Sequence, residues 1–315
     1  MRVVFAALLL LVFSPVALAQ EADVPRTADG RPDFQGIWEN RWLTPLERLD
    51  GTTEAIVSGD GVSTYVAALL ADREKNAGLH PDGDFDFAGL MPAGDGSFRT
   101  SLIVEPANGK RPETQLSKDL APIRTAISKA AENPEGLPND ARCMSASGRA
   151  PLAISPGSMY RQIVQTPEHM MIYTEDQMVT RIIGIGAAPR PDALVSLVGD
   201  SVASWEGDTF VVVTTNIRPQ LAPPEGPSFK QERRVTERFS LIDPDQISYD
   251  YLLEDSAMLT EPMRVQYTMT RTDHAMFESA CHEGNYAISG MMLGARVAKA
   301  AKPKPNAKPK PNSKH

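Results

Sequence analysis

The stretch RRVTERFSLIDPDQISYDYLLE, Arg233–Glu254, decides the fold of this chain. Apolar and polar residues alternate on both sides of the turn Asp243-Pro244-Asp245, and a period of two is that of a β-strand with one enclosed face. The turn is short enough to join neighbouring strands as a hairpin. We therefore predict an antiparallel pair formed by residues 233–242 and 246–254.

The same alternation continues through the second half of the chain. Further strands are predicted at residues 160–165, 170–174, 177–184, 201–205, 209–215, 263–270 and 276–281. Nine short strands joined mostly by tight turns favour a mainly β fold, in which an antiparallel meander forms a barrel or a strongly curled sheet.

The first half of the mature chain has a different composition. Residues 20–150 are predicted to be loop-rich and partly helical and to pack on a barrel of residues 151–296. Ser117 is the expected N-cap of the second helix, and Asn133-Pro134 its stop. The predicted elements are a strand at 33–40 and helices at 63–77 and 117–132.

Both ends of the chain are predicted to lie outside the fold. Residues 1–19 have the basic start, apolar core and Ala17-Leu18-Ala19 cleavage pattern of a secretory signal, so we expect a periplasmic or secreted protein. No stretch reaches the about 20 apolar residues of a membrane span, so no transmembrane segment is expected. Residues 297–315 carry six lysines and a Lys-Pro repeat, typical of a disordered tail. That tail is either simply solvated or in contact with an anionic surface.

The charge balance argues against nucleic acid as a partner. The chain has 32 basic and 40 acidic residues. Without Arg2 and the six lysines of the tail, 25 basic residues face 40 acidic ones, a net charge of −15 for residues 20–296. Such a body repels a phosphate backbone.

Cys143 and Cys281 are the two cysteines of the chain. In an exported protein they indicate one disulfide. The alternative is a pair of free thiols, one of them a nucleophile.

The alternating strands also predict what lines the enclosed face. Tyr249, Tyr251 and Tyr267 should point inward among Met, Val and Leu side chains, together with Glu237. Apolar walls with a few polar groups suit a small-molecule pocket, whereas the alternative is a filled core.

Glu237 is the first candidate catalytic residue. Burial would raise its pKa into the range of a general acid or base. Two alternatives stay open: a buried ion pair with an arginine such as Arg264 or Arg181, or a register that turns Glu237 to solvent.

The hexapeptide Cys281-His282-Glu283-Gly284-Asn285-Tyr286 supplies further candidates. His282 and Glu283 would follow a strand at the barrel mouth and take part in proton transfer with Tyr251, although a structural role for His282 is an equal alternative. The candidate ligand-binding residues are Tyr249, Tyr267, Asn285, Tyr286 and Trp205.

No cofactor or metal is predicted. The histidines lack the spacing of a zinc motif. The acidic run that begins at Asp82 lacks the glycine and the glutamate that close a calcium loop. Gly184-Ile185-Gly186 lacks the third glycine of a dinucleotide site.

Four blocks carry a resemblance to a family. They are ADGRPDFQGIW at 28–38, IVQTPEH at 163–169, WEGDTFVV at 205–212 and the hexapeptide from Cys281. On these blocks the chain resembles a large family of exported, largely uncharacterised bacterial proteins, which implies a lipocalin-like or related barrel and brings no catalytic residue with it. The chain departs from the pattern at Asp200, where relatives usually have histidine.

Two functions are consistent with these observations. One is a cofactor-independent lyase, hydrolase or isomerase that acts on an apolar or aromatic small molecule by acid–base catalysis. The other is a non-catalytic carrier or sensor that uses the same pocket. An enzyme needs two titratable groups that converge on one enclosed point.

Overall fold

The computed structural model describes residues 24–76, 89–129, 132–137, 141–143, 148–152, 154, 160–175, 179–217, 233–278 and 280–301. The predicted signal, the acidic run from Asp82 to Asp86 and residues 302–315 of the predicted tail lie outside the described residues.

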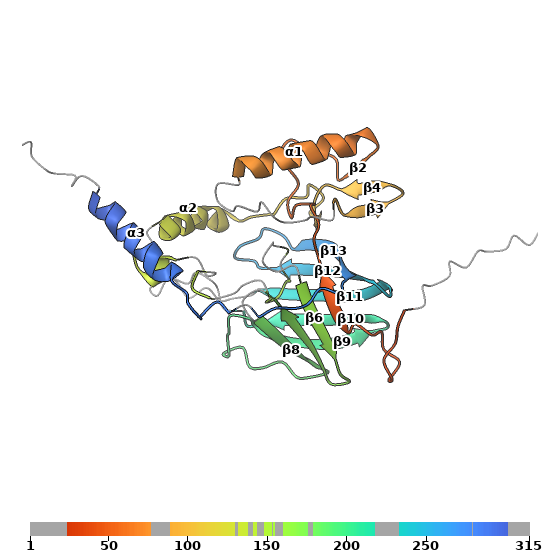
Figure 1. Ribbon diagram of the computed structural model, residues 1–315. Coiled ribbons are helices and arrows are strands. Elements are labelled where there is room, and N and C mark those ends of the chain that lie inside the picture. The colour runs from red at the N-terminus through yellow and green to blue at the C-terminus, as the bar shows by residue number, and fades with distance from the viewer. Residues whose placement is uncertain are drawn as a thin grey trace, which may run out of the picture.

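Nine strands form a closed barrel (Figure 1). In spatial order they are β1 (Gly36–Glu39), β6 (Tyr160–Gln165), β7 (His169–Thr174), β8 (Val179–Ile185), β9 (Asp200–Glu206), β10 (Thr209–Thr215), β11 (Arg234–Asp243), β12 (Gln246–Glu254) and β13 (Met263–Arg271). The barrel closes because β1 pairs with both β6 and β13. A tenth strand, β5 (Ile103–Glu105), pairs with the start of β13.

The predicted mainly β barrel is therefore confirmed, with one pairing that differs from a meander. β8 and β9 run parallel, with Gly184 opposite Val202 and Ile185 opposite Ala203. Residues 186–199 join these strands, and a connection of this length lets the chain return to the end from which β8 started. The barrel is consequently mixed.

The prediction of a strand at 276–281 is wrong. The described residues of that segment have no strand structure. The reason lies in β1, which occupies the edges of both β6 and β13 and so leaves no edge for another strand there. The ninth strand of the barrel thus comes from the predicted strand at 33–40.

The two ends of the barrel differ. Tight turns connect Gln165 to His169, Glu206 to Thr209 and Asp243 to Gln246, and we call this the turn end. The loop end lies opposite, where β7, β10 and β12 end and β11 and β13 begin. Longer connections join the strands there.

The remaining first half builds a small second layer beside the barrel, which Figure 1 shows at the top. A second core gathers Leu43, Tyr65, Leu69 and Leu90. The elements are β2 (Ile56–Ser58), α1 (Asp60–Asn76), β3 (Pro92–Gly94), β4 (Ser97–Arg99), α2 (Gln115–Lys129) and the short 3-10 turn η2 (Pro134–Gly136). Both helices begin two or three residues before their predicted starts, so Ser117 lies inside α2 and is not its N-cap.

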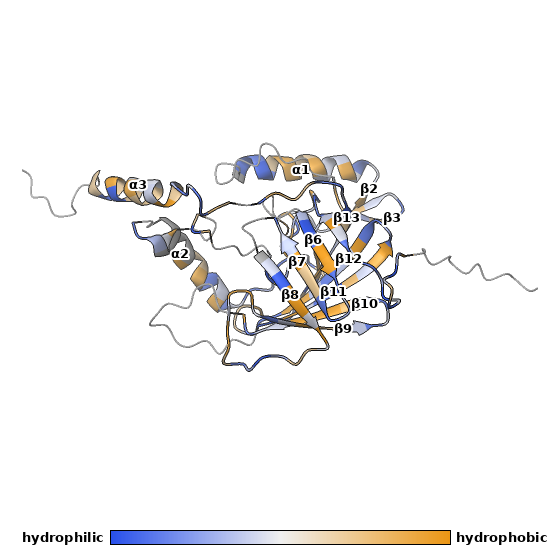
Figure 2. Cartoon of the chain, turned by 60° about the horizontal axis from the view of Figure 1, so that its bottom comes forward, coloured by the Kyte–Doolittle hydropathy of each residue, from blue (hydrophilic) through white to orange (hydrophobic). Residues whose placement is uncertain are grey.

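A third helix, α3 (Ala287–Ala301), ends the described chain. It was not predicted, and it extends into the segment that the Lys-Pro repeat marked as disordered. Figure 2 shows that it projects away from the barrel and carries several hydrophobic residues.

A disulfide joins Cys143 to Cys281, with 5.7 Å between their Cα atoms, as predicted. Such a bond fits an oxidising environment outside the cytoplasm. Among the residues that the structure describes, no helix combines the length and the apolar character needed to cross a bilayer.

Candidate functional site

The inward face of the barrel carries the predicted tyrosines and Glu237. Tyr249 and Glu237 are completely buried, and Tyr251 and Tyr267 nearly so. Aromatic rings fill the space, because Phe239 and Tyr267 pack against Tyr249 with ring centroids 4.9 and 4.8 Å away. The face is therefore oriented as predicted, and these side chains form a packed core.

Glu237 makes an ion pair inside the barrel. Arg181 donates through Nη1 to Oε1 at 3.0 Å and through Nη2 to Oε2 at 2.6 Å, and both side chains are buried. Tyr249 Oη donates to Oε1 at 2.7 Å. Of the alternatives that the sequence left open, the pair with Arg181 is the observed one.

Two hydroxyl groups complete this centre. The Oγ of Ser201 and the Oγ1 of Thr214 lie 3.2 and 3.3 Å from Nη2 of Arg181 and 2.8 Å from each other. A carboxylate held by a bidentate guanidinium and a phenol has little capacity left to exchange a proton with a substrate. The arrangement stabilises a charge inside the barrel.

Burial controls the electrostatics of the centre. It raises the pKa of Tyr249 well above its usual range, and the negative charge of Glu237 raises it further. Burial also raises the pKa values of Tyr251 and Tyr267. For Arg181 burial acts to lower the pKa, but the charge and hydrogen bonds of Glu237 outweigh it, so the pKa is raised. At neutral pH the phenols are thus neutral donors and Arg181 is a cation.

A segment from outside the sheet seals this core. The backbone N–H of Leu152 donates to Tyr249 Oη at 2.9 Å, and Tyr267 Oη donates to the carbonyl of Leu152 at 2.9 Å. Leu152 itself is buried. Both phenols that were expected to meet a ligand therefore bind the protein's own backbone.

A second buried arginine, Arg161, lies on β6 toward the loop end. Its Nη1 donates to Oδ1 of Asn40, and burial lowers its pKa. Asn40 Nδ2 and Thr174 Oγ1 are buried there without a hydrogen-bond partner among the described residues. Sequence reasoning missed Arg161, although its period-two spacing from buried Ile163 could have placed it on the inward face.

Arg149 lies close to the loop end and differs from the other arginines of the core. Its guanidinium is half-buried and has no hydrogen bond or ion pair within the described part of the chain. Burial and the nearby charge of Arg233 lower its pKa to about 10. Arg233 in turn pairs with Asp255 at 3.2 Å and lies near Tyr251. The loop end thus holds an arginine with no anionic partner among the residues that the structure describes.

The hexapeptide residues lie away from the buried centre. The N–H of Phe277 donates to Glu175, at the end of β7, so the chain after β13 returns to the loop end. His282 and Glu283 are exposed there, and Tyr286 is 83% exposed. The structure therefore brings Glu237, Tyr249 and Tyr267 together but does not bring His282 and Glu283 into contact with them.

Asn285 and Trp205 have structural contacts. Asn285 Nδ2 donates to the carbonyl of Ala141 at 3.0 Å and to Cys143 Sγ at 3.2 Å, beside the disulfide. The ring of Trp205 stacks near Phe34 and meets the edge of Phe210 at 5.0 Å, close to the turn end. Both side chains are thus engaged in contacts within the fold.

Asp200, where the resemblance leads one to expect histidine, is also engaged. Its carboxylate accepts a hydrogen bond from the backbone N–H of Arg190 at 2.6 Å and pairs with the Arg190 side chain at 3.0 Å. It therefore fixes the connection before β9.

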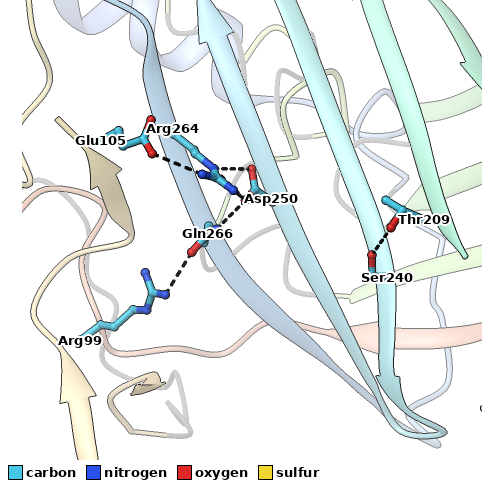
Figure 3. Close-up of polar contacts among 7 residues, drawn as sticks. All are labelled: Arg99, Glu105, Thr209, Ser240, Asp250, Arg264 and Gln266. Carbon is cyan, nitrogen blue, oxygen red and sulfur yellow. Dashed lines mark hydrogen bonds and ion pairs between the residues drawn. The ribbon is translucent and has the colours of Figure 1, made fainter. Parts of the chain in front are cut away.

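The outer barrel face carries a polar network (Figure 3). Arg264 binds Asp250 at 2.7 Å and Glu105 at 3.3 Å, and Gln266 links Asp250 to Arg99. Two hollows of the described chain lie outside the barrel, one over this network and the other lined by Val24, Pro25, Arg26 and Pro244. The charges of the network satisfy one another.

The fold and its centre define a class of protein, a closed mixed β-barrel whose described interior is filled around a buried ion pair. No protein-family model matches the chain, and a search of curated proteins gave no significant match. The described residues contain no cluster of three or more potential metal ligands. The resemblance to an exported bacterial family stays a prediction.

Proposed function

We propose that this protein is a non-catalytic binding protein that holds an anionic, partly aromatic small molecule at the loop end of its barrel. The observation that carries the proposal is Arg149, a half-buried guanidinium without a hydrogen bond or ion pair in the described chain. A partly desolvated cation gains most from an anionic partner, and guanidinium binds carboxylate or phosphate in a bidentate manner.

Two features of the loop end support this ligand class. Asn40 Nδ2 and Thr174 Oγ1, at the same end of the barrel, are buried polar atoms without a partner in the described chain, and such atoms call for one. Tyr251, which lies near Arg233, offers aromatic contact at the same end of the barrel.

The proposal favours binding over acid–base catalysis because of Glu237. Its carboxylate is fully buried and is bound by Arg181 and Tyr249. A general base must reach the proton that it abstracts. The disulfide supports a site of action in an oxidising compartment, in the periplasm or outside the cell.

A metabolite screen tests the proposal. The purified protein is incubated with an extract of small metabolites, and retained and free compounds are identified by mass spectrometry. We expect an unchanged anionic compound to be retained by the native protein and lost with Arg149→Gln. Arg234→Gln is the matched control, because Arg234 is an exposed arginine at the start of β11. Consumption of a compound by the protein would support an enzyme and overturn the proposal.

A defined probe sharpens the test. Titration with 2-naphthoate and with its uncharged amide separates the contribution of the anion from that of the ring. We expect the carboxylate to bind at least tenfold more tightly, in keeping with a charged hydrogen bond of about 1.5–3 kcal/mol. Arg149→Gln should abolish that difference, and equal binding of both probes by the native protein would contradict the role of Arg149.

A further inference from the structure

Helix α3 exposes its hydrophobic residues to solvent. None of its residues is buried, and Met291, Leu293 and Val297 are 41%, 63% and 60% exposed. Leu293 and Val297 are four residues apart and therefore lie on one face of the helix. Exposed apolar side chains that gather on one face of a helix mark an interaction surface.

The opposite face of α3 holds the helix against the body. Met292, Ala295 and Lys299 follow at the spacing of one helical face, and the first two are half-buried. Lys299 Nζ pairs with Glu132 Oε2 at 2.6 Å, and Arg296 Nε donates to the carbonyl of Glu132 at 3.1 Å. The contacts with the body thus orient Leu293 and Val297 outward.

The charge of this end of the chain is the reverse of that of the body. From Gly284 to His315 there is no acidic residue, whereas Arg296 and six lysines are present. A surface that combines apolar side chains with a series of basic residues complements an anionic lipid bilayer, in which apolar groups enter the acyl boundary and lysines meet the headgroups. Fifteen residues of helix are too few to span the bilayer.

We propose that α3, together with the basic residues that follow it, docks the protein on the surface of an anionic lipid bilayer. Leu293 and Val297 enter the boundary between headgroups and acyl chains, and the lysines after Ala301 bind the headgroups. This docking does not depend on the small-molecule site at the loop end.

Vesicle binding tests the proposal. The chain from Gln20 is sedimented with vesicles of phosphatidylcholine alone or of phosphatidylcholine and phosphatidylglycerol. We expect binding to the anionic vesicles at least tenfold stronger than to the neutral ones, with loss of most of that difference in high salt. Replacement of the five lysines after Ala301 by glutamine should reduce binding to the anionic vesicles.

Substitutions on the helix identify the surface. Leu293→Glu with Val297→Glu should weaken binding to anionic vesicles at least tenfold without changing the melting temperature, because neither side chain is buried. Leu70→Glu is the control, since Leu70 is a 51% exposed leucine on α1. Unchanged vesicle binding by the double variant would overturn the proposal. So would a dimer of the native protein that binds no vesicles and that the double variant abolishes, because the face of α3 would then bind a second copy.

Discussion

The barrel and helix α3 reverse the usual distribution of residue types. The barrel encloses the fully buried charges of Arg161, Arg181 and Glu237, whereas α3 presents Leu293 and Val297 to solvent. A buried charge is stable only when it is paired or hydrogen-bonded, and the centre of the barrel meets that condition. The exposed apolar side chains of α3 are not covered by any other part of the described chain. The comparison indicates that the barrel centre is built for stability and α3 for contact.

The disulfide offers the largest test of this division. It links Cys281, six residues before α3 begins, to Cys143 across a sequence separation of 138. In the chain-entropy model such a link destabilises the unfolded state by about 5 kcal/mol. Cys143→Ser with Cys281→Ser should therefore lower the free energy of unfolding by up to that amount, measured by urea denaturation. Unchanged stability would mean that loss of the disulfide does not raise the conformational entropy of the unfolded chain.

Glu237→Gln tests the barrel centre directly. It leaves Arg181 buried without its counter-charge, and breaking a buried pair in this way costs about 3–5 kcal/mol. The urea midpoint should fall accordingly. Asp250→Asn, on the outer network that Figure 3 shows, is the control and should cost less than about 1 kcal/mol because Arg264 there is partly exposed. Equal effects of the two variants would remove the distinction between centre and surface.

Alkaline pH probes the buried phenols. The pKa values of Tyr249 and Tyr267 are raised in the folded protein, so the folded state retains protons that the unfolded state loses above about pH 10. The stability that this provides is complete below pH 10 and decreases as the pH rises toward the folded pKa values, by up to about 1.4 kcal/mol per pH unit for each tyrosine.

Urea denaturation between pH 8 and 11 measures this dependence. Tyr249→Phe with Tyr267→Phe should flatten it, although the double variant is less stable at neutral pH. An identical slope in the variant would show that other groups cause the alkaline loss.

Removal of α3 should have the smallest effect on stability. A chain that ends at Tyr286 keeps the disulfide and loses the contacts of Lys299 and Arg296 with Glu132. Exposed contacts of this kind contribute well under 1 kcal/mol each, so the free energy of unfolding should change by less than about 1 kcal/mol. A larger loss, measured by the same urea denaturation, would show that α3 is part of the folded core.

The sequence predicted those parts of the barrel that local pattern determines. β6, β10 and β12 have their predicted bounds, because alternation and tight turns act within a few residues. β8 pairs with β9 in parallel, and β1 closes the barrel. Both pairings depend on which strand edges are free in the folded sheet, and a local sequence pattern does not indicate that. The α3 segment contains five alanines, two methionines and one leucine, all good helix formers, a signal that the neighbouring Lys-Pro repeat obscured.

The sequence predicted which side chains of the candidate site point inward, but it did not predict whether the interior is filled. Period two placed Glu237, Tyr249 and Tyr267 on one enclosed face. Whether that face is hollow depends on what arrives from elsewhere, and here Arg181 and the backbone of Leu152 fill it. The sequence named Arg181 as one of two possible partners of Glu237 but could not choose between them, and the contact of Leu152 comes from a distant segment that the strand pattern does not include.

The closure of the barrel by β1 has a consequence for how the protein is made. Gly36–Glu39 leaves the ribosome more than 200 residues before one of its partners, β13. Contacts of such high sequence separation form slowly and leave strand edges exposed while the chain is incomplete. The emerging chain is therefore an open sheet until Met263–Arg271 is available. The barrel acquires its final shape only after β13 has been synthesised.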